Sequence, residues 1–407
     1  MGRFIVIVLD GFGIGEMPDV SSVRPQDHGA NTFAHIVKAV PSLELPTLSR
    51  LGLANASGFE TNSILYSKTA VWGRAKLMHD GADTFFGHQE IMGTLPKKPV
   101  MEPIKNKLDT INDTLTKNGW NTRVYQGDQE RLLIVEECIT IADNIECDPG
   151  LAFNVTVALD DISFEWAVEV GRLVREVSTI SRVIVFGGRG VHLPDMLAAI
   201  EEYGAYIGVN APASGVYRSD YHCVHLGYGV NAEVQVPTIL GKMDVPVYLL
   251  GKVADVVSNA YGTSVSMVDT RAVLKETLAL LRKEKSGFFC VNVQETDLSG
   301  HQEDAMLFAS ILEVADAGIA DIVGELSGDD ILVVMADHGN DPAIGHPHHT
   351  REMVPLMIHS HQGGPLNIGV CETLSDIGAT ATAYFGAASP ENGTSFLELL
   401  ALPAFPV

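Results

Sequence analysis

The residues most suited to chemistry lie together near the C-terminus, where an adjacent Asp337–His338 pair is followed within about one loop by three more histidines. The pair comes directly after residues 331–335, an apolar run typical of a buried strand. Carboxylate and imidazole together suit a divalent transition metal such as zinc or manganese. Open α/β sheets place their sites at the carboxyl ends of strands. The segment therefore predicts a metal site, although a polar loop that happens to hold histidines would have the same composition. The three further histidines are His346, His348 and His349.

More candidate ligands follow two other predicted strands. Asp10 ends the apolar run at residues 4–9, and Asp297 and His301 follow the run at residues 287–293. Because parallel strands share an end, acids and histidines that follow neighbouring strands converge at one edge of the sheet. The combined set offers three carboxylates and three imidazoles, enough for two metal ions with about three protein ligands each. This set is Asp10, Asp297, His301, Asp337, His338 and His349.

Two metal ions about 4 Å apart can clamp the attacking and leaving oxygens of a phosphoryl transfer. Thr84, which directly follows Asp83, adds a hydroxyl nucleophile if a metal lowers its pKa. The sequence thus indicates phosphoryl-transfer chemistry at a two-metal site.

Several of these positions have a second interpretation. Asp297 and His301 would face the same way on one helical turn, but Asp297 could instead cap a helix N-terminus. His88, four residues after Thr84, could orient the site or serve only the fold. The roles of His346 and His348 stay open. Residues 11–15 have glycine spacing G-x-G-x-G rather than G-x-G-x-x-G, which disfavours a dinucleotide loop.

Apolar runs alternate with amphipathic stretches, which predicts a doubly wound α/β core. Pro355 indicates an edge strand or a strand start. After the Pro-Lys-Lys-Pro linker at residues 96–99, a different pattern predicts an α+β insertion. We expect a discontinuous metal-binding core, residues 1–97 and 228–407, around an insertion at residues 98–227. Strands are expected at 4–9, 122–125, 182–186, 245–250, 287–293, 331–335 and 354–359, and helices at 104–118, 165–177, 270–285 and 303–326.

Composition restricts the partners and the compartment. The 407 residues include 27 Lys+Arg and 51 Asp+Glu, so the net charge is 27 − 51 = −24. Such a chain is a poor binder of nucleic acid and of anionic membranes. The five cysteines are scattered without a C-x-x-C pair, which indicates reduced thiols in a cytoplasmic protein. The first residues do not resemble a signal peptide, and no apolar stretch reaches transmembrane length. The oligomeric state is not indicated.

Six short motifs follow one another along the chain. They are V-L-D-G-F-G-I-G at 8–15, G-A-N-T at 29–32, D-T-x-x-G-H-x-E-I-M-G at 83–93, G-K-V-A-D at 251–255, Asp297-Leu298-Ser299-Gly300-His301, and A-D-H-G-N-D-P followed by H-T-R-E within 336–352. The order of these motifs resembles the phosphopentomutase family of the alkaline phosphatase superfamily. The resemblance covers the expected core almost from end to end and is fainter over the insertion. It implies an alkaline-phosphatase-like core and a cap domain at the insertion, residues 98–227.

The resemblance also implies roles for the candidate residues. Asp10, Asp337 and His338 match one metal site of the family. Asp297, His301 and His349 match the other, and Thr84 matches the phosphorylated threonine. Two manganese ions are implied, with zinc or magnesium as alternatives and a sugar bisphosphate as a candidate activator. In the family, phosphate moves between C1 and C5 of ribose or deoxyribose. Arg218 and Lys252 match basic substrate contacts, and Asp128 lies in a segment that matches the family's substrate strip only in its Tyr and Asp.

The sequence departs from the family mainly around the substrate. The spacing from Asp297 to His301 is one residue shorter and closer to that of cofactor-independent phosphoglycerate mutases. His348, Ala82, Phe86 and Asn210 replace an acid, a lysine, a threonine and an expected arginine, respectively. The metal ligands are thus retained while the substrate wall is rewritten, as in uncharacterised phosphopentomutase-like bacterial paralogues.

Three functions follow from these observations. The first is a phosphomutase acting on a pentose phosphate or a related small phosphorylated metabolite through a phosphothreonine. The second is a metal-dependent phosphatase or phosphotransferase on the same core, with water or another acceptor. The third is a non-catalytic paralogue that binds a metal or a phosphosugar.

Overall fold

The computed structural model describes residues 2–146, 150–360 and 365–400, and the chain divides into two compact units. Unit 1 comprises Met1–Pro96 and Asn231–Val407, and unit 2 comprises Lys97–Val230. Each unit has its own hydrophobic core.

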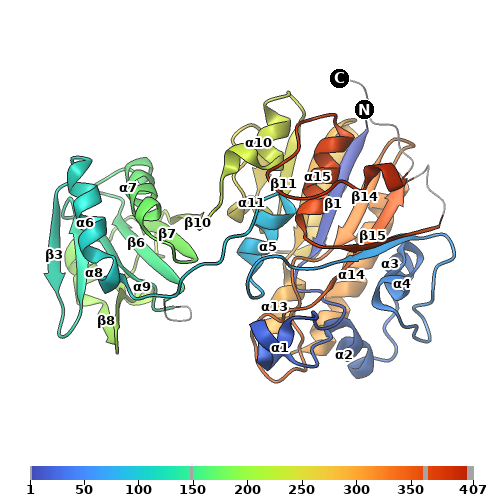
Figure 1. The fold of residues 1–407 in the computed structure, drawn as a ribbon, viewed down its shortest axis with the longest axis horizontal. Coiled ribbons are helices and arrows are strands. Elements are labelled where there is room, and N and C mark those ends of the chain that lie inside the picture. The colour runs from blue at the N-terminus through green and yellow to red at the C-terminus, as the bar shows by residue number, and fades with distance from the viewer. Residues whose placement is uncertain (1, 147–149, 361–364, 401–407) are drawn as a thin grey trace. The chain divides into compact units, whose positions relative to one another are not determined.

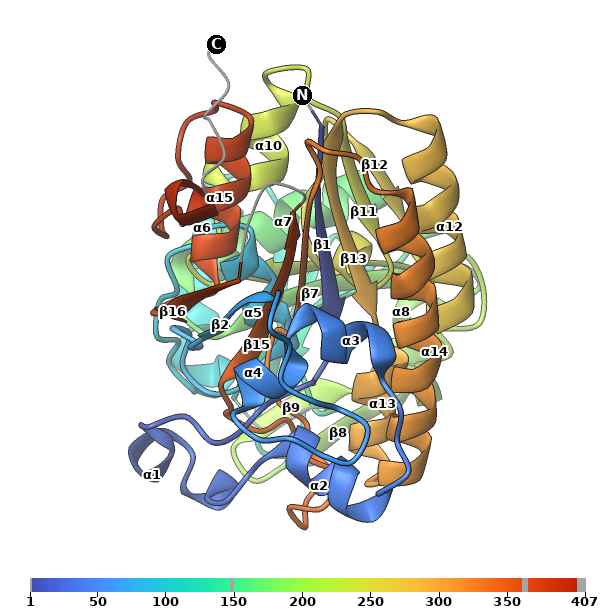
Figure 2. The same cartoon turned by 90° about the vertical axis from the view of Figure 1, so that its right-hand side faces the viewer.

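Unit 1 is built on a mixed sheet, and Figure 2 shows α12 and α14 on one of its faces and α10 and α15 on the other. In the described residues the sheet has eight strands, in the order β12-β11-β13-β1-β14-β15-β2-β16. Neighbouring strands from β12 to β14 run parallel, whereas β15 is antiparallel to both of its neighbours. The doubly wound α/β core expected from the sequence is confirmed. The strands are β1 Arg3–Leu9, β2 Val71–Ala75, β11 Val247–Leu250, β12 Thr263–Val265, β13 Gly287–Val293, β14 Ile331–Met335, β15 Val354–Ser360 and β16 Leu366–Cys371.

The helices of unit 1 pack on this sheet and on one another. α14 contacts α12, α2 and α3, and α15 contacts α10 and α5. They are α1 Val20–Val23, η1 Pro25–Asp27, α2 Thr32–Ala39, α3 Pro46–Leu51, α4 Leu53–Ser57, α5 Thr84–Ile91, η3 Ala232–Val234, α10 Val236–Gly241, α11 Val253–Val256, α12 Thr270–Lys283, α13 Glu295–His301, α14 Ala305–Glu325, α15 Ser375–Tyr384 and η4 Leu397–Leu400.

The central strands are apolar because both faces of the sheet are covered. Every residue of β1, β13 and β14 is buried. A parallel strand covered on both faces requires such a continuous apolar run rather than an alternating one. This packing fixes the carboxyl ends of the three strands, where the candidate ligands follow.

The edge position considered for Pro355 is wrong, because β15 lies between β14 and β2. Pro355 is instead the second residue of its strand, which agrees with the alternative expectation of a strand start. The ladder with β14 begins only at Met357, so the missing amide of Pro355 breaks no hydrogen bond of that ladder.

Over its described residues, unit 2 contains a six-stranded sheet, in the order β10-β7-β6-β5-β4-β3, and a two-stranded sheet of β8 and β9. β6 and β7 are parallel, and the remaining pairs are antiparallel. α7 packs on β6, β7 and β10, and α6 packs on α7, β3 and β4 (Figure 1). The elements are η2 Ile104–Asn106, α6 Leu108–Lys117, β3 Thr122–Gln126, β4 Arg131–Val135, β5 Ile139–Asp143, β6 Ala152–Ala158, α7 Phe164–Val177, β7 Arg182–Gly188, α8 Leu193–Ala198, β8 Ile200–Tyr203, β9 Tyr206–Val209, α9 Ala211–Ser214 and β10 His222–Gly227.

The helix expected at residues 104–118 is interrupted, because η2 and α6 are separate elements. The buried Asp143 carboxylate accepts hydrogen bonds from the amides of Ile104 and Ile207, at 2.8 Å and 3.0 Å. It therefore ties η2 and β9 to the end of β5.

Across the described ranges, no helix of either unit is long and apolar enough to cross a membrane.

Candidate metal centre

The predicted ligands come together because three adjacent strands end at one edge of the unit 1 sheet. β1 pairs with β13 up to Leu9 and Val293, and with β14 up to Val8 and Met335. Asp10 therefore leaves the sheet beside Asp337. Asp297 reaches the same edge from α13, which begins two residues after β13.

Asp10, Asp337 and His338 form one group of potential ligands. Their ligand atoms lie within 4.8 Å of one another, and all three side chains are fully buried. His338 Nε2 lies 3.4 Å from Asp10 Oδ1 and 3.3 Å from Asp337 Oδ2.

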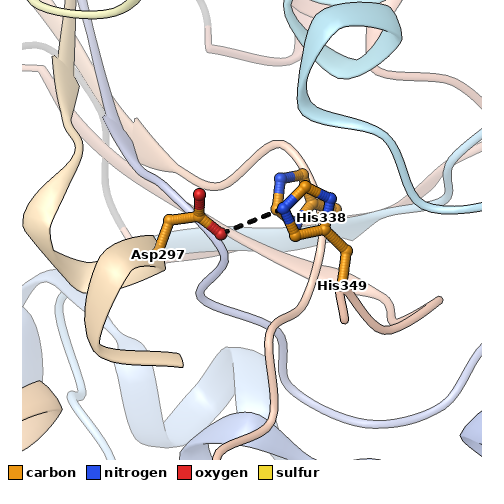
Figure 3. A group of neighbouring side chains, drawn as sticks. All are labelled: Asp297, His338 and His349. Carbon is orange, nitrogen blue, oxygen red and sulfur yellow. Dashed lines mark ion pairs between the residues drawn. The ribbon is translucent and has the colours of Figure 1, made fainter. Parts of the chain in front are cut away.

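A second group centres on Asp297. Its carboxylate faces the rings of His338 and His349 (Figure 3). Asp297 Oδ1 lies 3.3 Å from His349 Nε2, and Asp297 Oδ2 lies 3.4 Å from His301 Nε2. The N-cap residue of α13 is Gln294, and Asp297 lies within the helix. The interpretation of Asp297 as a helix cap is therefore wrong. This second group consists of Asp297, His338 and His349, so the two groups share His338, whereas His301 lies beside Asp297 but outside both groups.

All three histidines of the predicted set hydrogen-bond to the backbone through the same ring nitrogen. The Nδ1 of His338 donates to the carbonyl of Gly339 at 2.9 Å, that of His301 to Pro347 at 2.7 Å, and that of His349 to Ala82 at 3.0 Å. A backbone carbonyl on Nδ1 fixes the tautomer that leaves Nε2 with a free lone pair, as in metal-binding histidines. Each Nε2 points into the carboxylate cluster.

These lone pairs need a cation between them. His301 Nε2 and His349 Nε2 are only 3.0 Å apart, and both Nδ1 atoms are already committed to carbonyls. In the described part of the chain, the buried Nε2 of His338 has no hydrogen-bond partner. Facing lone pairs beside carboxylates fit divalent metal ions, so the residues present match the metal centre that the sequence predicts.

The local electrostatics also favour positive charge. Burial lowers the pKa of His338, but the carboxylates of Asp337 and Asp10 outweigh burial and raise it to about 10, so the Nε2 lone pair binds a cation strongly, whether a proton or a metal ion. Burial would raise the pKa of Asp297, yet Lys252 and the neighbouring histidines hold it well below its usual range. A buried site that holds its carboxylates ionised attracts cations strongly.

Lys252 is the one basic side chain placed among these acids in the described residues. It follows β11, and its Nζ lies 3.0 Å from Asp10 Oδ2 and 3.1 Å from Asp297 Oδ2. Burial lowers the pKa of Lys252, but the carboxylates of Asp10 and Asp297 outweigh burial and raise it. The ammonium group thus bridges one acid of each ligand group.

Thr84 is the first residue of α5, and its hydroxyl reaches the same cluster. Thr84 Oγ1 donates to Asp337 Oδ2 at 2.8 Å and lies 3.5 Å from Asp10 Oδ1. The Asp83 side chain caps α5 by accepting from the amide of Phe86 at 3.1 Å. A group at a helix N-terminus is favourably placed to carry negative charge.

Two buried side chains support this hydroxyl, and the sequence interpretation assigned neither of them. His88, whose role was left open, has Nδ1 at 2.8 Å from the Thr84 carbonyl and 3.2 Å from Asp337 Oδ2. Asn292 Nδ2 lies 3.0 Å from both His88 Nε2 and Asp10 Oδ2. Asn292 was detectable as the only polar side chain in the apolar run of β13.

Asn340 plays a similar part for Asp297 and was also missed. Its Nδ2 donates to Asp297 Oδ1 at 2.8 Å and to the Asp297 carbonyl at 3.1 Å, and it is fully buried. The sequence offered one signal for Asn340, which is an amide side chain directly after the predicted metal-binding His338-Gly339 pair.

Other predicted positions lie outside the cluster. His346 Nε2 is paired with Asp27 Oδ1 at 3.2 Å, and His348 packs its ring against that of His346. Neither belongs to the two ligand groups. Arg218 follows α9 and Asp128 occupies the β3–β4 turn, so both belong to unit 2, where both are exposed.

Comparison with known proteins defines the family. The model of the Metalloenzyme superfamily matches residues 2–389. A phosphopentomutase of Kosmotoga olearia is 30% identical, with 97% of this chain and 98% of the relative covered. A phosphopentomutase of Herpetosiphon aurantiacus is 29% identical, with 98% and 99% covered. A solved Leishmania mexicana phosphoglycerate mutase is a remote likeness, with 12% identity, a TM-score of 0.43 and 97% of each chain covered. The family model and the relative that is 30% identical show that the chain belongs to the metalloenzyme superfamily and, within it, to the phosphopentomutase family.

Proposed function

We propose that this protein is a metal-dependent phosphomutase that moves a phosphoryl group between two positions of a small phosphorylated metabolite through a phosphothreonine at Thr84. The name of its relatives makes a pentose phosphate the first candidate substrate. The proposal rests on one observation above all, the 2.8 Å contact from the Thr84 hydroxyl to an acid of the metal centre.

Asp10, Asp337 and His338 would hold one divalent ion, and Asp297, His301 and His349 would hold the other. Manganese is the expected metal, with zinc or magnesium as alternatives. Bound ions of this kind polarise phosphoryl oxygens and lower the pKa of a nearby hydroxyl.

The chain's own residues set up the transfer. His88 and Asn292 fix the Thr84 backbone and the two acids next to its hydroxyl. The α5 N-terminus offsets the charge of a phosphate on Thr84. Lys252 supplies a further positive charge between Asp10 and Asp297.

The reaction then needs two exchanges. In the first, the bond from phosphorus to Thr84 Oγ1 breaks, a bond to a substrate hydroxyl forms, and the hydroxyl proton passes to Thr84. The substrate is then a bisphosphate. In the second, Thr84 Oγ1 attacks the other phosphate, and its proton passes to the departing substrate oxygen. A sugar bisphosphate would provide the first phosphate on Thr84.

Unit 2 is the proposed cap. Arg218 is exposed, so its guanidinium is available for a substrate phosphate. Asp128 is a candidate contact for a sugar hydroxyl. A cap that excludes water during the exchange would favour a mutase over a phosphatase.

Intact mass spectrometry tests the phosphothreonine. The protein is incubated with manganese and glucose 1,6-bisphosphate, and the Thr84→Ala and Thr84→Ser variants are treated in parallel. We expect one added phosphate, mapped to residue 84, on the native protein and on the serine variant. Phosphorylation of the alanine variant, or of another residue in the native protein, would overturn the assignment.

A further inference from the structure

Unit 2 contains a surface cavity that the proposed reaction does not use. Its volume is about 630 Å³, within the range of small-molecule sites. It is formed by the residues after α6, the β4–β5 turn, the loop after β6 and one side of α7. Neither Arg218 nor Asp128 is among its lining residues.

Two tryptophans form an aromatic corner in this cavity. The rings of Trp120 and Trp166 are 5.8 Å apart with an interplanar angle of 74°. Trp166 is 60% exposed although it is a large apolar side chain. The two ring faces therefore offer a cation-binding surface in contact with solvent.

The polar lining is entirely acidic or neutral. The lining residues include Glu136, Asp161 and Glu169, and none of those described is a lysine or an arginine. Glu136 accepts hydrogen bonds from the amides of Asn121, at 2.9 Å from the backbone and 3.0 Å from the side chain. Asp161 lies 3.2 Å from His192, and Glu169 lies 3.7 Å from Arg172. Of these three acids, Asp161 and Glu169 thus have a basic partner, whereas the donors to the Glu136 carboxylate are neutral amides, so Glu136 is the acid available to a cation.

The β4–β5 turn presents this carboxylate at a conformational cost. Glu136 and Glu137 have φ values of 49° and 53°, where asparagine and glycine are the usual residues. The hydrogen bonds from Asn121 hold the Glu136 side chain in one place beside the tryptophans.

Aromatic faces and carboxylates together select one class of ligand. A phosphate would be repelled by the acids, and a bare metal ion would gain little from the indole rings. An organic ammonium ion satisfies both, because its charge meets the acids while its carbon substituents pack on the tryptophans and on Leu173. We propose that unit 2 binds a small organic ammonium compound in this cavity, independently of the metal centre.

Tryptophan fluorescence of the full-length protein tests this site. Trp72 is the only tryptophan outside unit 2, so a Trp72→Phe background makes the signal report on the cavity. Choline chloride is titrated at constant chloride concentration, and the neutral isostere 3,3-dimethyl-1-butanol is titrated in parallel. We expect a saturable change with choline at millimolar concentrations and a much weaker one with the isostere.

Variants distinguish binding in this cavity from binding elsewhere on the protein. Trp166→Ala and Glu136→Gln should each raise the half-saturating choline concentration, the former about tenfold. Tyr203→Ala removes another exposed aromatic of unit 2, 58% exposed, and should change nothing. Chelation of metals and the Thr84→Ala variant should also leave the half-saturating choline concentration unchanged. The test of this cavity is therefore independent of the proposed reaction. An equal response to the isostere, or no saturable response to choline, would overturn the proposal.

Discussion

The Nε2 atoms of His301 and His349 face each other at 3.0 Å, and each ring has its Nδ1 bound to a backbone carbonyl. Two neutral imidazoles in this arrangement repel each other unless a cation lies between them. Asp297, within 3.4 Å of both Nε2 atoms, completes a ligand set for that cation. This arrangement gives the metal centre its strongest support from geometry.

Removal of one of these imidazoles should weaken one metal site. We expect His301→Ala to lower manganese affinity at the Asp297 site by at least about tenfold. Loss of a residue that only supports a metal ligand already lowers metal affinity about this much, and loss of the ligand itself should lower it no less. Isothermal titration calorimetry with manganese measures the change. His348→Ala is the matched control, since this exposed histidine packs its ring against His346. Equal losses in both variants would contradict the assignment of His301.

Removal of Asn292 should lower kcat by more than a loss of folding stability alone would explain. Asn292→Val leaves Asp10 and His88 each without one hydrogen bond, so we expect about a 10- to 100-fold fall in kcat. Asn154→Val removes a buried amide from unit 2 and should leave kcat almost unchanged. Steady-state kinetics, with urea unfolding of both variants, makes the comparison. If kcat fell equally in both, Asn292 would have only a structural role.

The stability of unit 2 should depend on pH through Asp143. Burial raises the pKa of Asp143 to about 6, above the value of an unfolded aspartate. The folded state therefore binds the proton more tightly. Its contribution to stability is fully present below about pH 4 and is lost as the pH rises through about 6.

Asp143→Asn should flatten this part of the stability curve while lowering stability overall, since one backbone amide loses its acceptor. Urea unfolding followed by the fluorescence of Trp120 and Trp166, in the Trp72→Phe background, measures it. Asp128→Asn, at an exposed position of the same unit, should keep the native slope. Parallel curves for native protein and Asp143→Asn would rule out Asp143 as the source.

The sequence was informative wherever a chemical group followed a buried strand. Asp10, Asp297 and Asp337 could be placed together because apolar runs located the strands and parallel strands share an end. His88, Asn292 and Asn340 could not be assigned in this way, because their roles depend on which neighbour each side chain contacts across the sheet. Pro355 was misleading in part, since its strand lies inside the sheet but starts pairing with β14 after the proline.

The substrate wall was less accessible to sequence reasoning than the metal ligands. Arg218 and Asp128 were proposed from the family resemblance, and both lie in the separate unit 2. The aromatic corner of Trp120 and Trp166 was not anticipated, because these residues are far apart in sequence and meet only when α7 packs beside α6.

We propose that phosphate is exchanged between two positions of one sugar by way of Thr84, and ³¹P nuclear magnetic resonance of ribose 1-phosphate tests this exchange most directly. The manganese-loaded protein is primed with a trace of glucose 1,6-bisphosphate, with Thr84→Ala as the control. We predict that ribose 5-phosphate appears while total sugar phosphate stays constant, and that the control is inactive. Steady release of inorganic phosphate, or ribose 5-phosphate formation by the Thr84→Ala variant, would contradict the account.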